Sequence, residues 1–256
     1  MLLQPDEPPA VTVVRPAGRA SAVLICDHAS NRLPRALGDL GLPASRFSEH
    51  IAWDIGAANV ARRMSERLDA PLVLSGYSRL VIDCNRPLGV ATSMPELTCG
   101  VEVPGNAGLS PEASQARIEE LFRPYHRAIE GILEERGRAG LRSAILSVHS
   151  FTPEPLRGPR PWDVGILYKH GEDQRLADLL MDALRREPGI EVGDNQPYQV
   201  TSSTDYGIPV YAIQAGRPGV LIEVRQDHIA TAEEAQRWGD RLADAFLSIE
   251  GQLSFQ

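Results

Sequence analysis

Short apolar segments that end abruptly in polar residues recur four times along this chain and limit the folds open to it. Residues Ala22–Cys26 read AVLIC and lead directly into Asp27 and His28. The stretches 79–85, 143–148 and 219–225 repeat the pattern, each with charged or polar residues within or just after its last positions. Continuous apolar runs of this length, rich in β-branched residues, are typical of buried strands in a parallel or mixed sheet.

Segments with helical periodicity alternate with these strands. Further strands are expected at 11–14, 71–74 and 164–168, and helices at 54–68, 110–136, 173–186 and 231–249. Ser110 and Thr231 are predicted to cap their helices, and Pro124 to kink the helix that contains it. This alternation predicts an α/β protein, a three-layer α/β/α arrangement around a mostly parallel or mixed sheet. Without a linker or an internal repeat, residues 1–256 are expected to form one domain.

Composition excludes several classes of partner. The net charge of -8 and the lack of a long basic run argue against nucleic acid or an anionic membrane as a partner. Three cysteines without a CxxC pair favour a reducing compartment, and neither a signal sequence nor a membrane span is apparent. We therefore expect a cytoplasmic protein, while its oligomeric state stays open.

Polar residues at the strand ends are the candidates for a functional site. In open α/β sheets, ligands bind in the crevice beyond the carboxyl ends of the strands. Four such ends are expected to meet in one cleft, and these are the residues that they bring: His28, Asp83, Asn85, Arg86, His149, Glu223 and Arg225. This convergence predicts an enzyme.

Two of these residues, His28 and His149, suggest a metal site. Two imidazoles with one carboxylate and an open position are typical of hydrolytic zinc, although each histidine could instead cap its strand by hydrogen bonding. The carboxylate is expected to be Asp54, at the start of a predicted helix, where an acid is also favoured by the helix dipole. His50 and Asn31 are alternative third ligands.

The segment Arg79–Arg86 is predicted to bind a substrate carboxylate. As a strand it would place Arg79, Asp83 and Asn85 on one face. Guanidinium groups bind carboxylates through two parallel hydrogen bonds, so Arg79 and Arg86 are candidates, with Asn85 as an added donor and Asp83 holding an arginine in place. A purely structural ion-pair network is the alternative. The irregular stretch 85–110 that follows is expected to be a functional loop or lid.

Glu223 is an acid inside the apolar segment 219–225 and needs either a partner or a function. It could pair with Arg225, two residues on. The functional interpretation is a general base, with Arg225 as a further substrate-binding residue.

Five pieces of sequence together resemble the N-formylglutamate amidohydrolase family and, more remotely, zinc carboxypeptidases and aspartoacylase. They are Asp27-His28-Ala29-Ser30, the Asp-x-Asn-Arg at residues 83–86, Arg123-Pro124-Tyr125-His126, Val148-His149-Ser150 and residues 222–227. The resemblance implies one zinc per chain on His28 and His149, Glu223 as base, and Asn85 and Arg86 as carboxylate binders. The carboxypeptidase-like relatives carry Glu three residues after the first histidine, where this chain has Asn31.

The expected function is therefore zinc-dependent hydrolysis of a small, anionic N-acyl amino acid. N-formyl-L-glutamate is the lead substrate, giving formate and L-glutamate, and the resemblance suggests a place in histidine degradation. A carboxypeptidase-like or aspartoacylase-like hydrolase of another acyl amino acid is the nearest alternative. A metal-free protein that binds small acids is the alternative from another class.

Overall fold

A central sheet carries the fold of this computed structural model, which describes residues 1–154 and 158–255. Its strands are β1 (Val11–Val14), β2 (Ala22–Cys26), β3 (Leu72–Ser75), β6 (Ala144–Phe151), β7 (Val164–Leu167), β8 (Val192–Asp194) and β9 (Gly219–Arg225). The seven strands follow the order β1-β3-β2-β6-β9-β7-β8. β3, β2, β6 and β9 are parallel, β1 is antiparallel to β3, and β7 is antiparallel to β9. A separate pair, β4 (Leu97–Thr98) and β5 (Val101–Glu102), forms a small hairpin.

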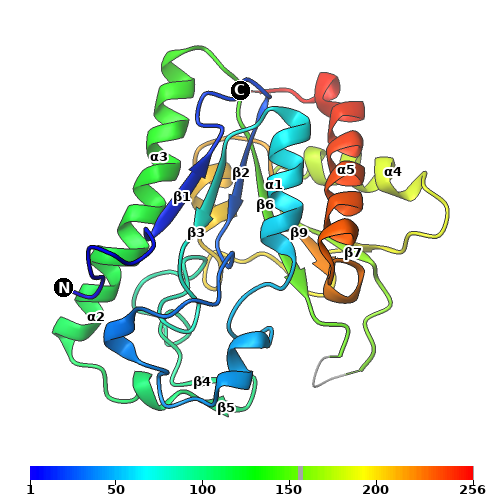
Figure 1. Cartoon of the computed structure of the whole chain (residues 1–256). Coiled ribbons are helices and arrows are strands. Elements are labelled where there is room, and N and C mark those ends of the chain that lie inside the picture. The colour runs from blue at the N-terminus through cyan, green and yellow to red at the C-terminus, as the bar shows by residue number, and fades with distance from the viewer. Residues whose placement is uncertain (155–157, 256) are drawn as a thin grey trace.

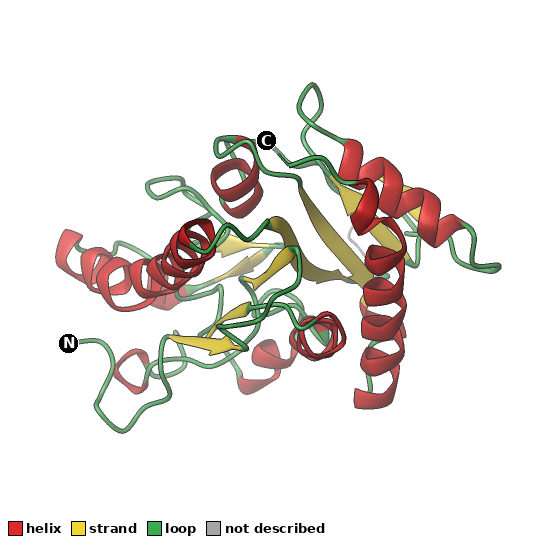
Figure 2. Cartoon of the chain, turned by 90° about the horizontal axis from the view of Figure 1, so that it is seen from above, coloured by secondary structure: helices red, strands yellow, loops and turns green. Residues whose placement is uncertain are grey.

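Helices cover both faces of the sheet, as the view from above shows (Figure 2). They are α1 (Ala57–Leu68), α2 (Pro111–Arg117), α3 (Arg123–Arg138), α4 (Arg175–Arg185) and α5 (Ala232–Ile249). One core forms where α1, α4 and α5 pack on the sheet, and a second lies on the opposite face under α3. In Figure 1, α3 stands on one side of the strands and α1 and α5 on the other. The predicted three-layer α/β/α architecture with a mixed sheet is confirmed.

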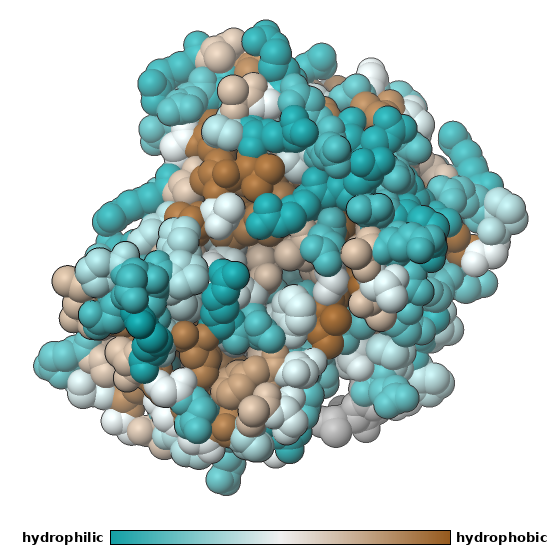
Figure 3. All heavy atoms as spheres, in the orientation of Figure 1, coloured by the Kyte–Doolittle hydropathy of each residue, from teal (hydrophilic) through white to brown (hydrophobic). Residues whose placement is uncertain are grey.

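Burial explains why the apolar segments become the central strands. Every residue of β2 and β6 is buried, so neither strand shows the alternation of a half-exposed sheet. Each large apolar side chain removed from water contributes roughly 1.5–3 kcal/mol. The face of the molecule seen in Figure 3 is largely hydrophilic and carries several apolar patches. None of the described helices combines the length and hydropathy needed to cross a bilayer.

Local capping fixes the ends of two helices as predicted. The Ser110 hydroxyl accepts a hydrogen bond from the Ala113 amide at the start of α2. Thr231 and Glu234 form a reciprocal capping box at the start of α5. The helix predicted at 54–68 instead begins at Ala57, because the Asp54 carboxylate contacts two histidines rather than capping the helix.

Two predictions about local structure are corrected. Residues 79–85 are irregular rather than a strand, and Leu80, Val81 and Ile82 are all buried, which produces a strand-like apolar run without strand pairing. The helix predicted at 110–136 contains a wider π-helical turn at Ile118–Phe122, just before Pro124. Proline has no amide hydrogen to donate to the preceding turn, and the wider turn accommodates that loss.

Candidate metal centre and active-site cleft

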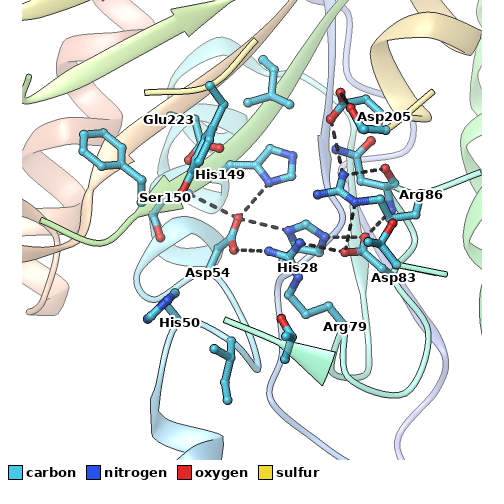
Figure 4. A pocket seen from close by; sticks show the side chains of 18 of the residues that line it. His28, His50, Asp54, Arg79, Asp83, Arg86, His149, Ser150, Asp205 and Glu223 are labelled. Atoms are coloured by element: carbon cyan, nitrogen blue, oxygen red, sulfur yellow. Dashed lines mark hydrogen bonds and ion pairs between the residues drawn. The ribbon is translucent and has the colours of Figure 1, made fainter. Parts of the chain in front are cut away.

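A cleft of about 450 Å³ opens at the carboxyl ends of β2, β6 and β9. Three segments of the chain that are far apart in sequence wall it: residues 79–99, residues 149–152 and residues 198–205. Its floor carries the charged and polar side chains drawn in Figure 4. The loop predicted at 85–110 supplies part of the wall, including Thr92, Leu97 and Thr98.

Three buried side chains converge at the centre of this floor. Asp54 Oδ2 lies 3.2 Å from His28 Nδ1 and 2.8 Å from His149 Nδ1. One possible ligand atom from each residue lies within 4.8 Å of the other two, and the two imidazole rings stand edge to face at 4.9 Å. His28, Asp54 and His149 together can therefore hold a metal ion. Figure 4 shows the three side chains pointing toward one another.

A further acid fixes the outer nitrogen of each imidazole. His28 Nε2 lies 2.7 Å from Asp83 Oδ1, and His149 Nε2 lies 3.2 Å from Asp27 Oδ2. The Ser147 hydroxyl, 2.9 Å away, also contacts His149 Nε2. Carboxylates that orient the far nitrogen of a histidine in this way are the usual outer support of metal ligands.

These acids dominate the ionisation of the two histidines. Burial and Arg79 lower the pKa of His28, but Asp83 and Asp54 outweigh them, so the pKa lies above its ordinary value. For His149, burial also acts downward, yet hydrogen bonds to Asp27 and Asp54 hold the pKa well above its ordinary value. Burial would raise the pKa of Asp54, but the two imidazoles keep it well below the ordinary range.

Two arginines project into the cleft, each held by acids. Arg79 donates to Asp83 at 2.8 Å and to Asp54 at 3.4 Å. Arg86 lies 3.4 Å from Asp205 and 4.0 Å from Asp83. Both guanidinium groups remain partly exposed, which leaves donors free toward the cleft.

Asn85 has its amide orientation fixed by the backbone. Its side-chain oxygen accepts hydrogen bonds from the amides of Tyr206 at 3.0 Å and Gly207 at 2.9 Å. The amide NH2 of this cleft-lining residue is therefore left as the donor toward a ligand. Asn85 also links the Arg86 segment to the loop that carries Asp205.

Glu223 lies on β9 beside the three candidate ligands. It is 7% exposed, and its Oε2 has no hydrogen-bond partner among the described residues. Burial raises its pKa to about 7, against the opposing effect of His149. A buried carboxyl group that titrates near neutrality and faces a cleft is suited to proton transfer.

Comparison with known proteins shows which family the chain belongs to. Residues 20–230, most of the chain, match the sequence model of the N-formylglutamate amidohydrolase family. The chain belongs to this family. It is 27% identical over 252 residues to the N-formylglutamate deformylase of Pseudomonas putida. The aligned region covers 92% of this chain and 91% of that protein.

Two solved structures are also similar to this member of the N-formylglutamate amidohydrolase family. The gene product Atu2144 of Agrobacterium tumefaciens is 36% identical, with a TM-score of 0.90 over 98% of this chain and all of that one. The N-formylglutamate amidohydrolase of Ralstonia eutropha JMP134 is 21% identical, with a TM-score of 0.70 over 95% of this chain and 97% of that one. At that identity, the second likeness supports the fold alone.

Some residues predicted for the site of this family member lie elsewhere. Arg225 is outside the cleft: its guanidinium group binds Asp227 at 2.8 Å and Asp163 at 3.4 Å, and it also donates to backbone carbonyl groups. It therefore pairs with these acids rather than with Glu223. Asn31 donates to the Phe47 carbonyl group and does not line the cleft, and His50 lines the cleft but lies outside the three-residue metal cluster.

Other residues at the site carried little signal in the sequence. Asp27 contacts His149, but the sequence shows only that Asp27 lies at a strand end, immediately before His28. Asp205 sits in a polar loop more than a hundred residues from Arg86, and no local pattern predicts that they meet. The same holds for Tyr198 and Arg160, which meet at the cleft wall through a contact between the guanidinium group and the aromatic ring.

Proposed function

We propose that this protein hydrolyses the formyl amide of N-formyl-L-glutamate, or of a closely related N-acyl amino acid, with one zinc ion held by His28, Asp54 and His149. The observation that carries the proposal is a buried cluster of metal-ligand type beside an unpartnered carboxyl group, Glu223, whose pKa is about 7. Membership of the N-formylglutamate amidohydrolase family supports the choice of substrate.

The donor set fits zinc. Two imidazole nitrogens and one carboxylate oxygen are the ligands of a catalytic zinc site, which keeps a further position open. The Nδ1 atoms of both histidines already converge on Asp54 Oδ2, and both Nε2 atoms are engaged by other acids. Bound there, zinc would supply Lewis acidity, which lowers the pKa of a water molecule toward about 7 and polarises a carbonyl group.

The residues of the chain divide the remaining work. Arg86 and the Asn85 amide group bind a carboxylate of the substrate, and Arg79, on the same side of the cleft, adds positive charge. Asp83 orients both Arg79 and His28, at 2.8 Å and 2.7 Å. One side chain, Asp83, therefore fixes both the position of the Arg79 guanidinium group and the orientation of a metal ligand, His28.

Glu223 acts as the general base and then as the general acid. It takes a proton from water as the water oxygen adds to the formyl carbon. It then gives that proton to the amine nitrogen as the carbon–nitrogen bond breaks, so that formate and the free amino acid leave. A carboxyl group with a pKa near neutrality can both accept and donate a proton at the working pH.

Metal analysis combined with a substrate panel tests this function. We expect about one zinc per chain and the release of formate from N-formyl-L-glutamate. Faster hydrolysis of another acyl amino acid would instead favour the carboxypeptidase-like or aspartoacylase-like alternative. If the protein binds small acids, but binds no zinc and hydrolyses no acyl amino acid, the metal-free binding protein is favoured. A cytoplasmic location and a place in histidine degradation are part of the same proposal and depend on the substrate.

A further inference from the structure

Arg160 is a cation beside the cleft to which the proposed function gives no part. Its guanidinium carbon lies 4.8 Å from the centre of the Tyr198 ring and 5.7 Å from that of Phe151. Its Nη1 donates to the Thr152 carbonyl group at 3.1 Å. All three of these contacts line the cleft, so Arg160 is held against the cleft wall.

The charge of Arg160 is unpaired, in contrast with the two arginines on the floor. Arg79 and Arg86 each contact two acids. Over residues 1–154 and 158–255, no carboxylate lies within ion-pair distance of Arg160. A guanidinium group that aromatic rings hold in place, with donors left over, is pre-organised to bind a carboxylate.

The position of Arg160 differs from that of Arg86. In Figure 4, Ser150 and Arg86 lie on opposite sides of the candidate metal ligands. Phe151, against which Arg160 packs, directly follows Ser150 on β6. The charge of Arg160 also affects His50, which lines the cleft. Burial lowers the pKa of His50 most, Arg79 lowers it further, and the positive charge of Arg160 contributes in the same direction.

We infer that Arg160 binds a second carboxylate of the substrate, on the far side of the metal cluster from Arg86. This inference rests on the proposed function and adds to it a residue that selects for a second carboxylate on the substrate. The second carboxylate belongs either to the amino-acid side chain or to the acyl group, and a pair of matched substrates separates the two. Arg160 would then determine specificity without taking part in the bond cleavage.

The test compares wild-type protein with Arg160→Met on matched substrates. Methionine keeps an unbranched apolar chain against the two rings and removes the charge. The first pair is N-formyl-L-glutamate and N-formyl-L-glutamine, which differ in the side-chain carboxylate. The second pair is N-succinyl-L-glutamine and N-butyryl-L-glutamine, which differ in a carboxylate on the acyl group. The control is Arg142→Met, because Arg142 packs over the Phe255 ring at 5.2 Å and does not line the cleft.

We expect Arg160→Met to lower kcat/KM roughly tenfold to hundredfold on the dicarboxylate whose second carboxylate Arg160 binds. The kcat/KM of the monocarboxylate partner of that pair should stay unchanged. Arg142→Met should change neither value. An equal loss on both members of a pair, or no loss on either pair, overturns the inference.

A binding measurement keeps this inference separate from the proposed function. Calorimetric titration of the zinc-supplied protein with L-glutamate and L-glutamine, and with succinate and butyrate, needs no turnover. Selective loss of affinity for one of the dicarboxylates in Arg160→Met supports the inference even if no acyl amino acid is hydrolysed. If the wild type hydrolyses N-formyl-L-glutamate but Arg160→Met binds all four ligands as the wild type does, the function stands and the inference fails.

Discussion

His149 and Glu223 are direct partners in the parallel register of β6 and β9. Their positions relative to each other are therefore set by the hydrogen bonds of two neighbouring central strands and not by a loop. The proposed proton-transfer group and a candidate metal ligand, held in this way, keep their separation, which catalysis requires to within a fraction of an ångström.

Replacement of either histidine of the cluster should remove the metal. We expect His28→Ala and His149→Ala to lose most of the bound zinc and most of the activity, because each deletes one of three ligands. His170→Ala is the control, since His170 is exposed and does not line the cleft. Zinc measured per folded chain decides the matter, and stoichiometric zinc in both variants would mean that the site is elsewhere.

Replacement of Asp27, the acid that contacts His149 Nε2, should lower the affinity for zinc measurably, but less than replacement of His149 itself. Asp27→Asn keeps the size of the side chain and weakens its hold on His149 Nε2, now at 3.2 Å. Loss of such outer support lowers metal affinity by about 10–100-fold. A chelator competition titration measures the change, with Asp39→Asn, an exposed aspartate away from the cleft, as the control. Equal zinc affinity in Asp27→Asn and wild type would show that Asp27 has no part in the site.

Glu223→Gln should separate catalysis from stability. The variant removes the proton acceptor with little change in shape, so we expect it to fold, keep its zinc and lose about 10²–10⁴-fold in rate. Arg225 does not depend on Glu223, because Asp227 and Asp163 pair with it. Glu233→Gln, on the exposed first turn of α5, is the control. A sharply lower melting temperature with near-normal turnover of the folded fraction would rule out the catalytic role.

Arg86→Lys should weaken catalysis although the charge is retained. Lysine cannot form the two parallel hydrogen bonds with which a guanidinium group binds a carboxylate. We expect a lower kcat/KM on the best substrate, while Arg225→Lys, outside the cleft, should leave it unchanged. The role assigned to Arg86 is refuted if the kcat/KM of both variants equals that of the wild type.

The features that the sequence predicts correctly are those formed by residues close together in the chain. A buried strand and the polar residue that ends it are adjacent in sequence, so His28 and His149 can be recognised from short segments. The error at 79–85 has the same origin, because an apolar run buried against the core under α3 has the composition of a strand. The sequence also allows Glu223 to pair with Arg225, but Arg225 ends the strand, where Asp163 and Asp227 bind it instead.

Contacts between distant segments leave no such pattern. Asp205 meets Arg86, and Arg160 meets Tyr198, because the loop at 196–207 crosses the strand ends. That crossing depends on Gly165 of β7, where an added Cβ atom would collide with the Gln196 carbonyl oxygen. A glycine in a strand signals a close approach of some kind but does not say which segment approaches.

A buried histidine of α3 should make the stability of the protein depend on pH. His126 is 4% exposed, its Nδ1 lies 2.7 Å from the Tyr211 hydroxyl, and burial lowers its pKa to about 4. In the unfolded chain a histidine titrates near about 6.5. Between these values the unfolded state binds a proton that the folded state does not, so the free energy of unfolding falls as the pH drops from about 6.5 to about 4.

The full effect of His126 corresponds to about 3 kcal/mol, at roughly 1.4 kcal/mol per pH unit. Urea unfolding of zinc-supplied protein at a series of pH values measures it. Other groups also titrate in this window, so the informative quantity is the difference in slope between wild type and His126→Gln, which keeps a polar group beside Tyr211 without the titration. We expect the variant to have the shallower slope between pH 6.5 and 4. Identical slopes would mean that His126 takes up a proton in the folded protein as readily as in the unfolded chain.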